Sequence, residues 1–251
     1  MPNERIALIT GANQGVGFQV AKELVQNGAT VFVGSRNVER GETAAKEIGA
    51  GAIALQIDVT DQASIAAAAE RIRKEFGRLD LLVNNAAISN TNRGDEPIHE
   101  YAKKTVASKV SLDEVRAVWE TNVFGALAVY QAMLPLLRES SDARIVNVSS
   151  GVGSLATNAD PEFHYRKMYG PVYPASKAAM NAVVLAMMIE LDGTGIKVNL
   201  VSPGFTKTAL NGFAGTESLE DGSREVVRIA LLGPDGPTNT FTRWEDTTIP
   251  W

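Results

Sequence analysis

The chain has 251 residues, no cysteine and a net charge of −5, from 24 basic and 29 acidic residues. A mildly acidic chain without a block of basic residues is a poor candidate for binding nucleic acid, and the lack of cysteine excludes disulfides and cysteine-ligated metals. No apolar run reaches about 18 residues and no signal segment precedes the first apolar run, so we expect no membrane span and a cytoplasmic protein.

Short apolar runs rich in β-branched residues alternate along the chain with segments of helical periodicity. The expected strands are residues 6–10, 30–34, 52–57, 79–84, 144–149, 196–201 and, at an edge, 239–242. The expected helices are residues 15–27, 37–48, 62–76, 112–137, 171–191 and 220–232. Asp61 and Ser111 are expected to cap two of these helices, and Pro171 is expected to fix the start of another.

This alternation requires parallel strands joined by right-handed crossovers, and the nearly continuous apolar strands are typical of a sheet covered on both faces. The sequence therefore predicts an α/β fold with a single domain over residues 1–251, a doubly wound, Rossmann-type parallel sheet with helices on both faces. Two polar segments, 89–110 and 151–170, follow expected strands. We expect functional loops there, because open α/β sheets bind ligands at the carboxyl edge; surface loops without a function are the alternative.

A glycine-rich segment, Thr-Gly-Ala-Asn-Gln-Gly-Val-Gly at residues 10–17, joins the first strand to the first helix. Gly11 allows a tight turn, and Gly15 and Gly17 allow the backbone to approach a pyrophosphate that faces the free amides of the helix start. The position predicts a dinucleotide site, whereas a plain turn is the alternative for glycines alone. The expected cofactor contacts here are Gly11, Asn13, Gln14, Gly15, Val16 and Gly17.

The end of the second strand indicates which nicotinamide cofactor is preferred. NAD sites place an acidic residue here to bind the ribose 2′-hydroxyl, but this chain has Ser35 followed by Arg36. A neutral side chain beside a guanidinium suits a 2′-phosphate, so we expect NADP(H) to be favoured over NAD(H). A solvated arginine at the start of a helix is the alternative.

Tyr173 and Lys177 lie four residues apart in an expected helix, and therefore on one face of it. A tyrosine with an ordinary pKa of about 10 is a poor acid/base at neutral pH, and a nearby ammonium lowers that pKa by stabilising the phenolate. The pair predicts a group that protonates an alkoxide formed by hydride transfer. A surface pair without chemistry is the alternative.

Six motifs in this order resemble those of the short-chain dehydrogenase/reductase family. They are the glycine segment with its Gly-x3-Gly-x-Gly spacing, Asn-Asn-Ala-Ala at 84–87, Thr-Asn-Val-Phe-Gly at 121–125, Ser-Ser at 149–150, Tyr-Pro-Ala-Ser-Lys at 173–177 and Pro-Gly-Phe-Thr at 203–206. Ala87 departs from the glycine that the family has there. The long loops and the final Ile-Pro-Trp are similar to the carbonyl-reductase branch of the family.

The resemblance implies roles for particular residues. Tyr173 is the acid/base, Lys177 also contacts the nicotinamide ribose, and Ser150 is the donor that polarises the substrate carbonyl. Asn122 resembles the family residue that bends its helix and holds a water beside the lysine. The further cofactor contacts that the resemblance implies are Asp58, Val59, Asn85, Ala86, Pro203, Gly204 and Thr206.

The expected activity is hydride transfer between NADP(H) and a small-molecule ketone or aldehyde, or the matching alcohol. Two alternatives are a catalytically silent NADP-binding sensor on the same fold and an epimerase or dehydratase of the broader superfamily. His99 and His164 have no partner at ligand spacing, so no metal is expected. Many family members form tetramers through the helices that hold Asn122 and Tyr173, so we expect a homo-oligomer.

Overall fold

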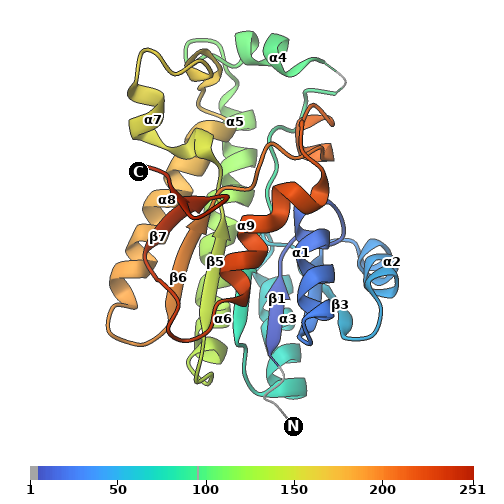
Figure 1. The fold of residues 1–251 in the computed structure, drawn as a ribbon. Helices are drawn as coiled ribbons and strands as arrows, with labels where there is room; N and C mark the ends of the chain where they lie inside the picture. Colours follow the sequence, from blue (N-terminus) through green and yellow to red (C-terminus); the bar gives the residue numbers. More distant parts are fainter. Residues whose placement is uncertain (1–4, 95) are drawn as a thin grey trace.

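A single sheet organises the chain. The computed structural model describes residues 5–94 and 96–251. Its strands are β1 (Ile6–Ile9), β2 (Thr30–Ser35), β3 (Ala52–Gln56), β4 (Leu81–Asn84), β5 (Arg144–Val148), β6 (Lys197–Val201), β7 (Thr240–Arg243) and β8 (Thr247–Thr248). They form an eight-stranded sheet in the order β3-β2-β1-β4-β5-β6-β7-β8, in which all pairs are parallel except β7 with β8, as Figure 1 shows.

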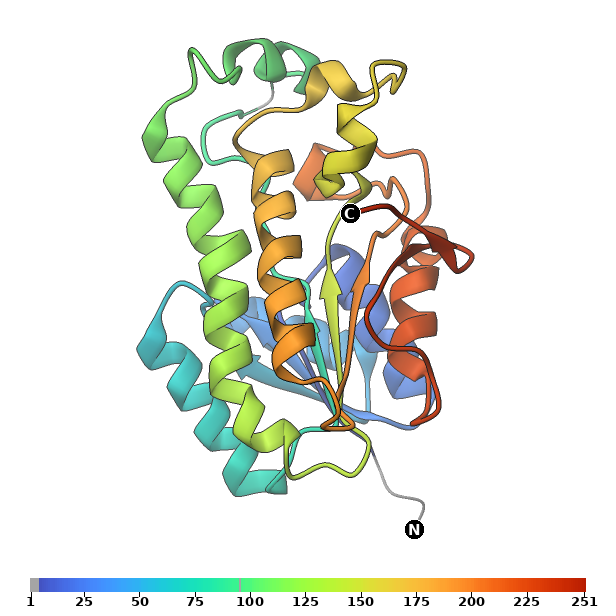
Figure 2. The ribbon, with the colours of Figure 1, turned by 90° about the vertical axis from the view of Figure 1, so that its left-hand side faces the viewer.

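Helices cover both faces of this sheet. The α-helices are α1 (Gly15–Gln26), α2 (Val38–Ile48), α3 (Gln62–Phe76), α4 (Ile98–Lys104), α5 (Leu112–Trp119), α6 (Ala126–Leu137), α7 (Leu155–Ala159), α8 (Tyr173–Glu190) and α9 (Leu219–Leu231). α3, α5, α6 and α8 lie on one face and α1, α2 and α9 on the other, which Figure 2 shows edge-on. Within the described residues, no helix combines the length and apolar character that crossing a membrane demands.

Strand β4 illustrates why the apolar runs of the sequence are nearly continuous. Leu82 packs into the core beneath α3, α6 and α8, whereas Leu81 and Val83 pack into the core beneath α1 and α9. All three side chains are fully buried. A strand that supplies both cores cannot alternate apolar with polar residues. The expected doubly wound, Rossmann-type sheet with helices on both faces is confirmed.

The helix expected over residues 112–137 forms, but a π-helical turn, η1 (Glu120–Gly125), separates α5 from α6. Gly125 lies against the loop after β3, where an added Cβ would be 2.9 Å from the Val59 carbonyl oxygen. A π-turn inserts one extra residue into the helix and is frequent at functional sites. The apolar periodicity of the sequence continues through it and therefore does not reveal it.

Three smaller features differ from the sequence expectation. α8 begins at Tyr173, so Pro174, not Pro171, occupies its first turn, where a missing amide hydrogen costs no helical bond. The polar segments expected as loops contain the short helices α4 and α7. β8 was not expected, because two residues are too few for a periodic signal.

Asp80 joins the start of β4 to its surroundings. Its buried carboxylate accepts hydrogen bonds from the Ile6 amide at 2.8 Å, the Ser140 hydroxyl at 2.6 Å and the Arg78 guanidinium at 3.0 Å.

Asp80→Ala should lower the free energy of unfolding by about 2–4 kcal/mol, because it removes the acceptor of a buried amide. Urea unfolding measures this change. The exposed Asp192→Asn control should shift stability by less than about 0.5 kcal/mol, and equal small shifts in both variants would contradict the assignment.

Candidate active site

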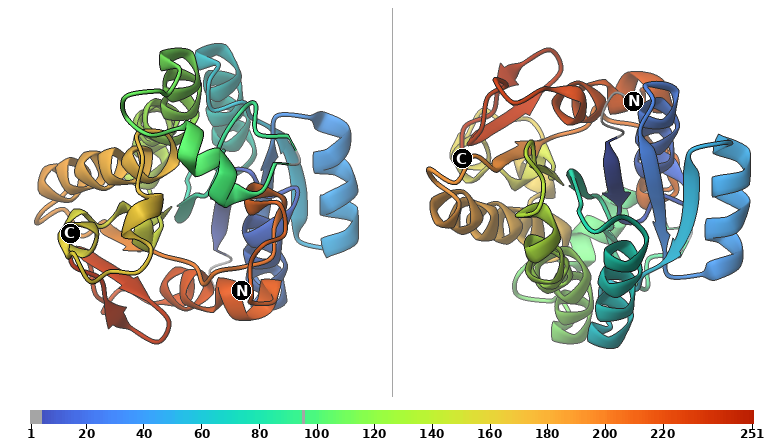
Figure 3. Two further views of the ribbon diagram at one scale, coloured as in Figure 1. Left: turned by 90° about the horizontal axis from the view of Figure 1, so that it is seen from above. Right: turned by 90° about the horizontal axis from the view of Figure 1, so that it is seen from below.

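The candidate residues gather at the carboxyl edge of the sheet. Most of them follow β1 to β6, whose parallel course brings these strand ends together, and Asn122, Tyr173 and Lys177 lie in η1 and α8. Seen from above in Figure 3, α4, α7 and the short 3-10 turn η4 (Ala209–Asn211) lie over this edge. The two polar segments that the sequence singles out therefore emerge on the same side as Tyr173.

The glycine segment has the geometry that a pyrophosphate requires. Gly11 and Gly15 have φ values of +64° and +62°, a region that favours glycine. An added Cβ at Gly17 would lie 2.4 Å from the Asn85 side-chain nitrogen and 2.8 Å from the Gly11 carbonyl oxygen. No side chain caps the start of α1 at Gln14, so its first amides face outward toward an anion site. The segment therefore fits a dinucleotide.

Thr10 and Asn85 lock this segment to the end of β4. The Thr10 hydroxyl accepts hydrogen bonds from the amides of Asn85 and Ala86, both at 3.0 Å. In return, the Asn85 side chain donates to the carbonyl oxygens of Thr10 at 2.9 Å and Gly11 at 3.1 Å. In the sequence, Thr10 was recognised only as part of the glycine motif. A hydroxyl at this position can accept two backbone hydrogen bonds at once, and it is the signal that could have revealed this connection.

Arg36 and Asp58 lie at the corner that follows β2. Arg36 is exposed, whereas Ser35 is buried and its hydroxyl donates to the Asn37 carbonyl at 2.8 Å. The backbone amide of Thr60, with a contribution from the charge of Arg36, lowers the pKa of Asp58 below its ordinary value. Arg36 and Asp58 therefore share this corner, as a cofactor site predicts. Val59 instead turns its side chain toward Gly125 and the core.

Tyr173, Ser150 and Lys177 come together although Ser150 and Tyr173 belong to different elements. The Ser150 side chain hydrogen-bonds the Tyr173 hydroxyl across the 151–170 segment. Lys177 lies one turn along α8, with Nζ 5.8 Å from the centre of the Tyr173 ring. The residue is only 2% exposed, and its ammonium donates to the Val148 carbonyl oxygen at 2.8 Å. The structure thus unites the three residues that the sequence analysis grouped.

Burial sets the protonation of this group. Desolvation raises the pKa of Tyr173 to about 12, opposed by the hydrogen bond from Ser150, and desolvation lowers the pKa of Lys177 to about 8. The expectation that Lys177 lowers the tyrosine pKa is therefore wrong for this structure. The cause is that the lysine charge is itself desolvated and is directed to Val148. Tyr173 is accordingly protonated at neutral pH.

Asn122 connects the π-turn η1 to the end of β4 and to α8. Its side chain exchanges two hydrogen bonds with the backbone of Ile88 and donates a third to the Ser176 hydroxyl, each at 2.9 Å. Ser176 in turn donates to the Tyr173 carbonyl oxygen at 2.7 Å. Asn122 is buried and lies where the resemblance implies a bend in the helix. It acts on Tyr173 through this chain of bonds and not by direct contact.

The serine next to Ser150 has a different task. Ser149 is buried, and its hydroxyl bonds the Asn181 side chain of α8 at 2.5 Å. The hydroxyl of Ser202 accepts from the Gly151 amide at 2.9 Å. Asn181 and Ser202 were not foreseen, because neither belongs to a local motif. Together they fix the chain on both sides of Ser150.

Thr206 lies in a loop that a carboxylate closes. Its hydroxyl donates to the Gly204 carbonyl oxygen at 2.9 Å, and it is 4% exposed. The Glu217 carboxylate accepts from the Phe205 amide at 3.1 Å and occupies the space that a Gly204 side chain would need, since an added Cβ would be 1.8 Å from Oε2. Pro203 precedes this turn. Gly204 is therefore required by Glu217, a residue that the sequence analysis missed.

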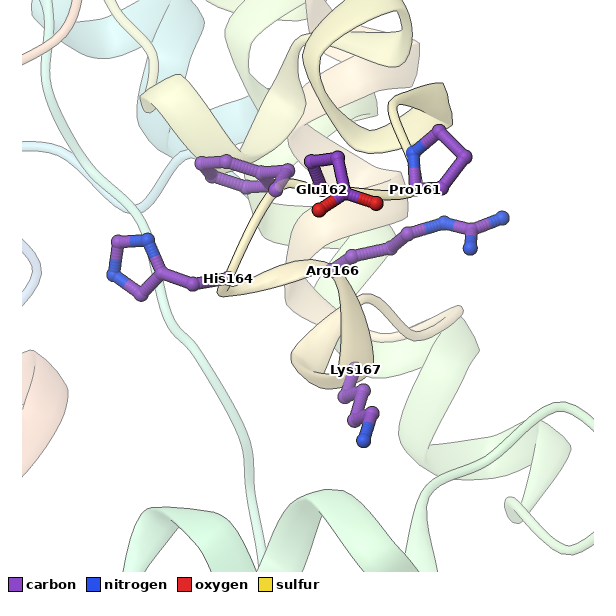
Figure 4. A pocket seen from close by; sticks show the side chains of 6 residues that line it. Pro161, Glu162, His164, Arg166 and Lys167 are labelled. Carbon is purple, nitrogen blue, oxygen red and sulfur yellow. The ribbon is translucent and has the colours of Figure 1, made fainter.

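Two hollows lie beside this edge. One, of about 540 Å³, is formed by the 151–170 segment and is shown in Figure 4; its lining is Pro161, Glu162, Phe163, His164, Arg166 and Lys167. This short stretch folds around its own concavity, so the hollow is not the catalytic centre. The other, of about 260 Å³, lies between the 89–110 segment and α5. Among the described residues, no cluster of three or more histidines and carboxylates is arranged to hold a metal.

Comparisons with known proteins agree with this arrangement. The family model for short chain dehydrogenases matches residues 5–218. The short-chain dehydrogenase anuI of Penicillium roqueforti is 38% identical over 250 residues, which cover 96% of this chain and 93% of that protein. Salutaridine reductase of Papaver somniferum is 30% identical over an alignment of 298 residues including gaps. This alignment covers 94% of this chain and 93% of that protein.

Solved structures extend the similarity to the whole fold. The structure of salutaridine reductase from Papaver somniferum superposes with a TM-score of 0.79 at 28% identity, covering 95% of this chain and 99% of that one. The NADPH-bound carbonyl reductase from chicken fatty liver superposes with a TM-score of 0.81 at 25% identity, covering 99% and 100%. This chain therefore belongs to the short-chain dehydrogenase/reductase family and is an oxidoreductase whose Rossmann-type fold binds a nicotinamide cofactor.

Proposed function

We propose that the chain is an NADP(H)-dependent carbonyl reductase in which Tyr173 is the general acid. The observation that carries the proposal is the group of the half-buried Ser150 and Tyr173 with the buried Lys177, in which the Ser150 side chain bonds the Tyr173 hydroxyl. A proton donor and a hydrogen-bond donor at one point are what a carbonyl needs when it becomes an alkoxide.

Each residue then has a defined task. The nicotinamide, when bound, supplies the hydride. Ser150 donates to the substrate carbonyl oxygen and stabilises the negative charge that develops there. Tyr173 delivers its proton to the same oxygen, and its pKa of about 12 keeps that proton in place at neutral pH. Lys177 holds a positive charge behind Tyr173 and contacts the nicotinamide ribose.

Arg36 supports NADP(H) in preference to NAD(H). It is exposed at the end of β2, and no carboxylate stands at Ser35 to bind a free 2′-hydroxyl. Its guanidinium is therefore free to bind the 2′-phosphate in a bidentate manner. The structural neighbours at 25% identity do not agree on the cofactor. The carbonyl reductase from chicken fatty liver is bound to NADPH, whereas a 3-ketoacyl-(acyl-carrier-protein) reductase from Brucella melitensis is complexed with NADH. The preference for NADP(H) is therefore argued from the residues of this chain.

The substrate is a small ketone or aldehyde with an apolar body. Four large side chains near the carboxyl edge are exposed, a feature typical of apolar ligand contact; they are Tyr165, Met168, Phe205 and Phe213. They belong to the 151–170 segment and to the loop after β6. We infer that these two parts, together with the 89–110 segment, wall the substrate site.

A homo-oligomer is part of the proposal. Three large apolar side chains are exposed on the helices that carry Asn122 and Tyr173, with exposed fractions of 54% for Phe124, 45% for Leu185 and 69% for Ile189. A second copy would bury them. They lie away from the carboxyl edge, since Leu185 and Ile189 belong to the second half of α8.

Tyr173→Phe should lower kcat for ketone reduction by roughly 10²–10⁴-fold, because only the transferable proton is lost. The Kd for NADPH, measured by fluorescence titration, should change little. Tyr130→Phe is the matched control, since it removes a hydroxyl that bonds Glu190 at 2.9 Å, far from the site. A Tyr173→Phe enzyme as active as the Tyr130→Phe enzyme would refute the role of Tyr173.

Arg36→Asp should lower kcat/KM with NADPH by roughly 10–100-fold more than with NADH, because a carboxylate then faces the 2′-phosphate. Steady-state kinetics with both cofactors measure the ratio. Lys46→Asp makes the same change of charge at the other end of α2 and should leave the ratio unaltered. An unchanged ratio in Arg36→Asp would show that Arg36 is only solvated.

Lys177 predicts a pH dependence of stability. Its folded pKa of about 8 lies below the ordinary value of 10.5, so between these values the unfolded chain binds a proton that the folded chain does not. Stability relative to Lys177→Met should therefore rise by about 1–2 kcal/mol from pH 7 to pH 9.5. The raised pKa of Tyr173 acts only above about pH 10. Urea unfolding at several pH values tests this, with the exposed Lys46→Met as control; parallel curves for wild type and Lys177→Met would contradict it.

A further inference from the structure

Glu114 is a buried carboxylate that the proposed mechanism does not use. It lies in the first turn of α5 and is 4% exposed, whereas the side chain of its neighbour Asp113 is 91% exposed. Burying a charge is costly unless hydrogen bonds satisfy it. Glu114 must therefore find donors outside its own helix, and these come from the 89–110 segment.

The donors lie at two places in that segment. The Thr91 amide donates to Glu114 at 2.8 Å, the Thr91 hydroxyl donates as well, and the Tyr101 hydroxyl donates at 2.5 Å. Desolvation would raise the pKa of Glu114, but these hydrogen bonds lower it overall, so the carboxylate is ionised at neutral pH. Burial and the bond to Glu114 raise the pKa of Tyr101, so its hydroxyl keeps its proton. One carboxylate thus joins the strand-proximal part of the segment to α4.

The same segment is held at two further points. Asn122, two helical turns beyond Glu114, binds the backbone of Ile88. On the opposite side, the Ser89 hydroxyl donates to the Leu210 carbonyl oxygen at 2.5 Å. The Arg93 guanidinium lies so close to Gly212 that an added Cβ there would be 2.8 Å from it. The segment therefore connects the α5–η1 helix to the loop after β6.

We propose that Glu114, with Tyr101 as its hydrogen-bond donor, is a positioning residue that fixes residues 88–94 and 96–101 as a wall of the substrate site and so selects which carbonyl compounds bind productively. The inference rests on the proposed reductase function. A wall that shifts by a fraction of an ångström changes how the substrate carbonyl meets Ser150 and Tyr173, while the glycine segment at the other end of the cofactor site is untouched. The effect should therefore appear in substrate choice and not in cofactor affinity.

The test compares Glu114→Ala, Glu114→Gln and Tyr101→Phe with Asp113→Asn, which removes a charge from the adjacent exposed position. Four quantities are measured in the full-length protein. They are the Kd for NADPH, kcat/KM for a small and for a bulky ketone, the enantiomeric ratio of the alcohol formed, and amide hydrogen exchange over residues 88–105. Exchange reports the position of the segment independently of turnover.

Glu114→Ala should lower kcat/KM for the bulky ketone about 10–100-fold relative to the small one, and change the enantiomeric ratio. Glu114→Gln and Tyr101→Phe should act in the same sense but less strongly, and they decide the question if Glu114→Ala does not fold. Exchange over 88–105 should rise, while the NADPH Kd stays within about twofold. Ketone ratios, enantiomeric ratio and exchange equal to those of Asp113→Asn would overturn the inference, as would a uniform loss for both ketones with weakened NADPH binding.

The two proposals fail in different ways. If the wild-type protein reduces no ketone or aldehyde, the proposed function fails, whereas unchanged exchange in Glu114→Gln refutes the anchoring role whatever the activity. If wild type is active and the variants keep its substrate preference, only the role of Glu114 is lost.

Discussion

The parallel course of β1 to β7 is the constraint on which the site depends. Parallel strands end at the same edge, so every segment that follows β1, β2, β4, β5 or β6 starts from a common place. Residues as far apart as Gly15 and Thr208 come together without any long-range motif that pairs them, since an added Cβ at Gly15 would be 3.5 Å from the Thr208 side chain. The central strands supply the rigidity, because β1, β2, β4 and β5 are buried along their whole length, and the polar chemistry is confined to where they end.

Buried and half-buried polar side chains turn this edge into a defined geometry. Asn85 holds the glycine segment, Asn122 holds the exit of β4 and, through Ser176, the start of α8, and Glu217 holds the loop that carries Thr206. Asn85 and Asn122 each make two or more hydrogen bonds to backbone or hydroxyl groups, and Glu217 accepts one from the Phe205 amide. Away from bulk water, an unmade bond is expensive. Loops that would otherwise sample many conformations are therefore restricted to one.

The electrostatics of α8 follow from the same burial. Tyr173 and Lys177 are adjacent on one face, yet desolvation moves the pKa of the tyrosine up and that of the lysine down. Both shifts favour the uncharged forms. A neutral, protonated tyrosine beside Ser150 is ready to give its proton to an alkoxide.

Local sequence was sufficient to predict the strands of the parallel sheet, most helices and the groups of polar residues at the strand ends. Periodicity, glycine spacing and the Tyr-x-x-x-Lys pattern can each be recognised within a few residues. The sequence placed Ser150, Tyr173 and Lys177 in one group through a resemblance, and the fold brings them together. It could not show the π-turn, the Glu114 anchor or the direction of the Tyr173 pKa shift. Those properties depend on which distant groups exclude water and donate hydrogen bonds, and that information arises only when segments far apart in the chain pack against one another.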